Sequence, residues 1–80
     1  MNDDWFAISP EDASILLFKK CVELILCQKS KSEITTDITV RILTQRLYGD
    51  YRQLHNTQEF KRAEKHVHHF KNTGLGKELF

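Results

Sequence analysis

The sequence has few of the residues that punctuate or cross-link small folds: one proline, three glycines and two cysteines in 80 residues. So few glycines and prolines argue against an all-β chain, which needs many tight turns. Two cysteines, Cys21 and Cys27, are too few for the disulfide framework of a small secreted domain. We therefore expect a helical protein of a reducing compartment.

Long hydrophobic runs are also missing. Apolar stretches such as 15–18 are far shorter than the roughly 20 residues that cross a membrane as a helix. The first residues, Met1 to Asp4, do not form the basic and then apolar start of a signal peptide. Together these absences predict a soluble cytoplasmic protein with no membrane contact.

An excess of charge of one sign is lacking as well, since 12 Lys and Arg residues face 11 Asp and Glu residues, for a formal net charge of +1. Hydrophobic residues make up 40% of the chain, which is enough for one core. A domain this short buries only roughly 60% of the surface of its unfolded chain. We expect a single domain over 1–80 with flexible ends at about 1–8 and 74–80, and self-association as an additional source of stability.

Motifs that carry catalysis or bind small ligands are not found. The Gly-x-Gly-x-x-Gly and Gly-Lys-Ser/Thr phosphate loops do not occur, and both cysteines stand in apolar surroundings typical of packing residues. His66 and His69, and likewise Glu64 and His68, are spaced so that two side chains reach one ion, but two ligands do not make a structural zinc site. We therefore expect no enzyme activity, no cofactor, no metal and no small-molecule substrate.

The clearest helix start is at Ser9-Pro10, where a capping hydroxyl and a φ-locked proline precede the acids Glu11 and Asp12. It predicts a helix over about 10–28. The apolar residues of this helix cover about 200° of its circumference, more than packing on one side requires. The helix therefore either runs through the centre of the domain, which we favour, or meets a partner chain. The predicted homodimer or partner interface comprises Leu17, Phe18, Cys21, Leu24 and Ile25.

The middle of the chain is ambiguous. Residues 28–33 are polar and predict a loop, and residues 38–42 then alternate apolar and polar as a half-buried strand does. Apolar residues from Val40 to Leu54 instead recur on one helical face. We favour a helix over about 36–54, with Gly49 as an alternative end, and the strand alternative for 36–43 stays open.

A third helix is predicted over about 57–72. Asn56-Thr57-Gln58-Glu59 has capping-box spacing, and Asn72-Thr73-Gly74 supplies a stop. Apolar residues at 60, 63, 67 and 70 form a narrow stripe along it. The fold class that follows is all-α, a small bundle of three main helices.

The opposite face of this third helix is the sharpest functional feature. Residues 60–71 hold four Lys or Arg residues and one Glu, a net charge of +3 in a nearly neutral chain. Such a face suits an acidic surface of a protein partner or the phosphates of a nucleic acid. Basic residues also gather near helix C-termini merely because the helix dipole favours them there. The candidate contact residues are Lys61, Arg62, Lys65, His66, His68 and His69.

Part of the chain resembles the small helical regulators of bacterial biofilm and acid-stress control, although its loop differs in length from theirs. The resemblance lies in residues 22–26, the polar loop after them, residues 34–36, and the pairs at 42–43 and 46–47. The resemblance implies a small helical regulator. Size, missing catalytic chemistry and the wide apolar arc independently predict a dimeric, non-enzymatic regulator or adaptor of the inhibitor or connector type, acting by protein–protein interaction. The alternative is a nucleic-acid-binding transcriptional regulator that uses the basic face.

Overall fold

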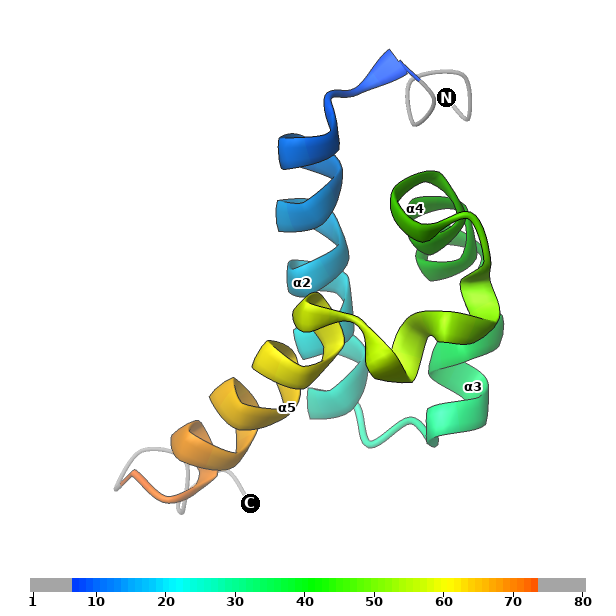
Figure 1. The fold of residues 1–80 in the computed structure, drawn as a ribbon. Helices are drawn as coiled ribbons and strands as arrows, with labels where there is room; N and C mark the ends of the chain where they lie inside the picture. The colour runs from blue at the N-terminus through cyan, green and yellow to red at the C-terminus, as the bar shows by residue number, and fades with distance from the viewer. Residues whose placement is uncertain (1–6, 74–80) are drawn as a thin grey trace.

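The computed structural model describes residues 7–73, and the elements within this range are all helical (Figure 1). They are α2 (Pro10–Leu26), α3 (Lys31–Thr36), α4 (Ile38–Tyr48), the 3-10 helix η1 (Tyr51–Asn56) and α5 (Gln58–Lys71). The predicted all-α class is confirmed, and the strand alternative for 36–43 is wrong, since no strand occurs between residues 7 and 73. The chain has more helical elements than the three we predicted.

Helix α2 is the element on which the others are assembled. The Ser9 hydroxyl accepts a hydrogen bond from the Asp12 backbone N–H (3.2 Å) and so caps the helix start that the sequence predicted. The helix ends at Leu26, about one turn after Glu23. Helix α4 packs beside its N-terminal half and α5 crosses its C-terminal half (Figure 1). Because α2 is covered from two directions, its wide apolar arc is used largely within the chain.

The predicted loop at 28–33 is wrong from Lys31 onward, where α3 begins. The Ser30 hydroxyl accepts from the Glu33 backbone N–H (3.1 Å) and caps the new helix. Ile34 is the only residue of α3 that is fully buried. A helix this short with one buried side chain has a mostly polar sequence, and for that reason its composition resembled that of a loop.

Helix α4 ends at Tyr48 with Gly49 as its C-cap, so the alternative end at Gly49 is confirmed and the continuous helix over 36–54 is wrong. Gly49 adopts the left-handed conformation (φ 78°), which favours glycine because it lacks a Cβ. The 3-10 helix η1 then begins after Asp50, whose carboxylate accepts a hydrogen bond from the Arg52 backbone N–H (2.9 Å). The tighter turns of η1 still bring Leu54 into the core.

The core lies where α2, α4, η1 and α5 meet, and α3 adds Ile34 to it. Its buried members are Ala13, Leu17, Cys21, Ile34, Val40, Leu43, Leu54, Phe60 and Ala63.

Of the predicted flexible ends, 1–6 and 74–80 lie outside the described residues. Ile8, by contrast, packs against the core, and its carbonyl accepts hydrogen bonds from the Arg46 guanidinium (2.8 and 3.2 Å). Among residues 7–73, no helix combines the length and the apolar character that crossing a bilayer demands.

Candidate functional site

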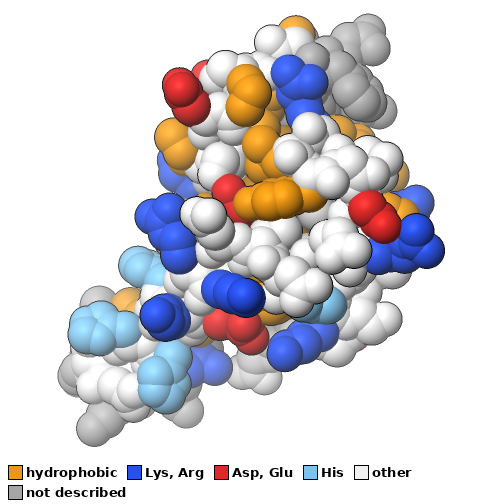
Figure 2. Space-filling model, viewed as in Figure 1, with side chains coloured by type: hydrophobic (Ala, Val, Ile, Leu, Met, Phe, Trp, Pro, Cys, Tyr) orange, Lys and Arg blue, Asp and Glu red, His pale blue; other side chains and the backbone are white. Residues whose placement is uncertain are grey.

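The six predicted contact residues of α5 share one exposed helix surface, which we call the basic face: Lys61, Arg62, Lys65, His66, His68 and His69. Thr57 caps this helix by accepting from the Phe60 backbone N–H (3.2 Å), and the opposite stripe of Phe60, Ala63 and Val67 is buried. The buried stripe therefore fixes which side of α5 faces outward. Figure 2 shows blue and pale-blue side chains gathered over this part of the molecule.

Lys61 and Lys65 form no ion pair in the described part of the chain, and Arg62 acts on the buried Glu59 only from beyond ion-pair distance. No described carboxylate lies within 4.0 Å of Lys61, Arg62 or Lys65. Glu64, the one acid beside them, forms an ion pair with Lys31 of α3 (3.8 Å). The basic face thus presents its positive charge to whatever approaches from solvent.

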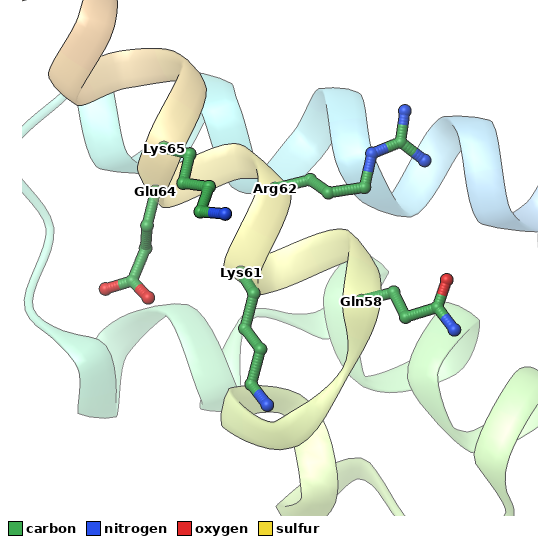
Figure 3. Close-up of a pocket in the computed structure, with 5 residues that line it drawn as sticks. All are labelled: Gln58, Lys61, Arg62, Glu64 and Lys65. Carbon is green, nitrogen blue, oxygen red and sulfur yellow. The ribbon is translucent and has the colours of Figure 1, made fainter.

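A shallow depression of about 500 Å³ lies over the N-terminal half of this helix. The described residues that line it are Gln58, Lys61, Arg62, Glu64 and Lys65. In the close-up of Figure 3 the Lys61 and Lys65 side chains extend from α5 while the Arg62 side chain reaches across toward α2. The depression is open and cationic, a shape suited to a protruding acidic side chain or segment.

Phe18 of α2 joins the two sites that the sequence predicted separately. The Arg62 guanidinium carbon lies 5.4 Å from the centre of the Phe18 ring, within range of a cation–π interaction. The His66 ring meets Phe18 edge-on, with centroids 5.9 Å apart. Phe18 is half-buried, so the seam between α2 and α5 offers an aromatic edge beside the basic face.

The rest of the predicted interface on α2 is not arranged as expected. Leu17 and Cys21 are fully buried inside the chain, so they present no surface to a second molecule and are not interface residues. Helices α4 and α5 cover that side of α2, which the apolar arc alone did not reveal. Leu24 and Ile25 are half-buried and pack against the same core. Burial, with a smaller effect of the nearby Glu59 charge, raises the pKa of the Cys21 thiol to about 12.

For Glu59 the sequence predicted only a role in helix capping. Its side chain is buried, with 7% exposed, and accepts hydrogen bonds from the Tyr48 hydroxyl (2.6 Å) and the Ser14 hydroxyl. One carboxylate therefore ties α5 to both α4 and α2. Glu59 precedes Ala63 and Val67 by four and eight residues, and this helical spacing placed it on the buried stripe.

The carboxylate of Glu59 is held in its charged form. Burial on its own would raise the pKa, but the hydrogen bonds from Ser14 and Tyr48, together with the positive charge of Arg62, lower it below its ordinary value. For Tyr48, burial and the hydrogen bond to the charged Glu59 raise the pKa to about 12. A carboxylate engaged in this way is a structural tie and not a free acid or base.

The histidine pairs considered as metal ligands are turned to other neighbours. His66 contacts the Phe18 ring, and the His68 ring nitrogen Nε2 lies 3.3 Å from the Asn72 side-chain nitrogen. Within residues 7–73, no three His, Cys, Asp or Glu side chains are grouped closely enough to hold a metal ion.

No family model, curated protein or solved structure matches the chain. The resemblance of residues 22–47 to small helical regulators therefore rests on the residues alone.

Proposed function

We propose that this protein is a small, cytoplasmic, non-enzymatic regulator or adaptor, and that the basic face binds an acidic surface of a protein partner. The observation that supports this most directly is a set of three exposed cations, Lys61, Arg62 and Lys65, none of which has a described carboxylate within 4.0 Å. Complementary charge of this kind speeds association and selects partners of the opposite sign.

The half-buried Phe18 ring strengthens the case for a protein partner. Protein interfaces combine an apolar or aromatic centre with a polar rim, and arginine is enriched in them. Phe18 with Arg62 above it provides the beginning of such a centre, and Lys61 and Lys65 provide the rim. Binding would bury the exposed part of the ring without requiring any catalytic group.

A nucleic acid is the second candidate, because the same cations suit phosphates. Three lysine and arginine contacts would neutralise about three phosphates, which predicts a salt slope of roughly −2.7. Raising the salt from 50 to 200 mM would then weaken binding about 40-fold. So few contacts give weak, nonspecific binding, and the exposed aromatic rows on which single strands stack are not found among residues 58–71. We therefore favour the protein partner.

The proposal is tested by affinity capture with three versions of the full chain: wild type, the double variant Lys61→Glu with Lys65→Glu, and the control Lys29→Glu. Lys29 is exposed, lies outside α5 and has a side chain in a 3.9 Å surface ion pair with Glu33, so its reversal tests whether a charge reversal elsewhere on the surface has the same effect. A protein captured by wild type and control but lost with the double variant is then purified and titrated against all three.

We expect the double variant to bind the purified partner at least about tenfold more weakly than wild type, with higher salt reducing the difference. Equal binding by all three proteins would show that the basic face is not the contact. A labelled DNA duplex is titrated in parallel at 50 and 200 mM salt. Micromolar duplex binding that falls with salt and disappears in the double variant would favour the nucleic-acid alternative instead.

A further inference from the structure

A second surface, on α4 and η1, has a different character from the basic face. A depression of about 250 Å³ is lined by Ile38, Arg41, Ile42, Gln45 and Tyr51, and we call it the α4 groove. Ile38 at its edge is 68% exposed, the highest value among the large hydrophobic side chains of the described residues. The groove is therefore an apolar surface that the described part of the chain leaves uncovered.

The α4 groove carries one positive charge. The Arg41 guanidinium carbon lies 4.4 Å from the centre of the Tyr51 ring, so the cation is held flat against the groove wall. No carboxylate of residues 7–73 lies within 4.0 Å of Arg41. An occupant that satisfies this groove needs an apolar side chain with a carboxylate close to it.

The first turns of α2 have that composition. Ile15 is 52% exposed, and it follows Glu11 and Asp12 by one helical turn. Neither acid has a cationic partner within 4.0 Å in the described range, and the capping hydrogen bond at Ser9 uses the Asp12 backbone and not its carboxylate. We call Glu11, Asp12 and Ile15 the α2 ridge. Ridge and groove are complementary in charge, and each leaves an isoleucine in solvent.

We propose that the α4 groove of one molecule binds the α2 ridge of a second copy of this chain, with Ile15 against Ile38 and Ile42 and the ridge carboxylates facing Arg41. Such a contact is head-to-tail, since it joins two different surfaces. It replaces the interface predicted around the buried Leu17 and Cys21. The contact does not involve the basic face. Experiments can therefore refute the proposed function without refuting this contact, and can refute the contact without refuting the proposed function.

Two single variants separate the halves of the contact. Ile15→Lys removes the apolar centre of the ridge and halves its negative charge, since one lysine is added beside Glu11 and Asp12, yet it leaves the groove intact. Ile38→Glu places a carboxylate one turn before Arg41, where it neutralises that cation, and leaves the ridge intact. Both positions are largely exposed and helical, so neither change disturbs the core, and thermal unfolding of each variant verifies this. Lys29→Gln, at an exposed position outside both surfaces and outside the basic face, serves as the control because it changes the net charge by −1, as Ile38→Glu does.

Sedimentation velocity over protein concentrations from micromolar to millimolar provides the measurement. A contact made by two short patches belongs to the weak class of interfaces, below about 1,200 Å² in total, so wild type should associate toward the upper end of this range. We expect Lys29→Gln to associate as wild type does. Each ridge or groove variant alone should associate at least about tenfold more weakly, because it leaves an isoleucine without its apolar partner.

The mixture of the two variants is the decisive sample. The intact ridge of Ile38→Glu can enter the intact groove of Ile15→Lys, so an equimolar mixture should form a heterodimer that grows no further. Wild type remaining monomeric at millimolar concentration would overturn the proposal and would leave the groove to another kind of partner. Variants that associate as wild type does, or a mixture that stays monomeric, would overturn it as well.

Discussion

Replacing Glu59 with glutamine should lower the free energy of unfolding by about 2 kcal/mol at pH 7. Hydrogen bonds to a charged group contribute roughly 1.5–3 kcal/mol each, and Glu59 accepts two of them. The amide keeps the shape: one hydroxyl can still donate to its oxygen, and the other can turn to accept from its NH2 group. Because Tyr48 is also 43% exposed, the loss falls well below the sum. A chain of 80 residues is stable by about 4–12 kcal/mol in total. The change is therefore a substantial fraction of the whole.

Thermal unfolding followed by circular dichroism measures this loss. For a domain of this size, 2 kcal/mol corresponds to a decrease in Tm of about 8–16 °C. The matched control is Glu64→Gln, the same chemical change at an exposed position of the same helix. Glu64 takes part only in a 3.8 Å surface ion pair with Lys31, so its replacement should cost at most about 0.5 kcal/mol.

The pH dependence tests whether the charge of Glu59 matters. Because the folded-state pKa of Glu59 lies below its ordinary value of 4.5, its stabilising effect is complete above that value and is lost as the pH falls through the folded pKa. The difference in stability between wild type and Glu59→Gln should therefore be constant near neutral pH and shrink in acid. A difference that stays the same down to the acid transition, or no difference at pH 7, would refute the assignment of a charged tie.

Three further predictions concern the thiols and the helix ends. In the folded protein at pH 8 one thiol, Cys27, should react rapidly with a disulfide reagent, because Cys21 is buried and its pKa is raised to about 12; two equally fast thiols would contradict this. Gly49→Ala should lower the free energy of unfolding measured in urea by about 1 kcal/mol, since φ is 78° and no atom lies within 4 Å of the added Cβ; an unchanged midpoint would mean that α4 ends differently. Asp37→Ala should cost about 1 kcal/mol in the same assay by removing the cap of α4, whereas Asp37→Asn should restore most of the loss.

The helix starts were the most predictable part of the fold, because their signals are local. Ser9 with Pro10 caps α2 as its sequence indicated, and α5 begins within a residue of the predicted position, although Thr57 and not Asn56 is its cap. The boundary between α3 and α4 was harder to predict from the sequence. Asp37 both ends one helix and caps the next, with its carboxylate accepting from the Thr39 and Val40 backbone N–H groups. A single extended residue between two helices leaves no run of loop residues to detect.

The candidate site was predictable to the extent that it depends on one helix. The helical period alone placed Lys61 and Lys65 on an exposed side of α5. Which part of the α2 arc stays uncovered depends on how α4 and α5 pack against it, and this is a property of the tertiary structure. For that reason Leu17 and Cys21 were assigned to an interface although they are buried, while Ile15 and Ile38, which lie outside on different helices, were not recognised as surfaces.

The position of Glu59 near the start of α5 has a consequence for motion along that helix. The hydrogen bonds that join Glu59 to α2 and α4 lie in the first turn of α5, as does the buried Phe60 side chain. Val67 is the last buried side chain along this helix. Backbone amides from Lys61 onward in the first half of α5, which donate hydrogen bonds within the helix, should therefore exchange their hydrogens much more slowly than those near its C-terminal end. His68 and His69 belong to the half that opens more readily. A partner would thus meet a contact surface that is firmly positioned at Lys61 and adjustable at its histidines.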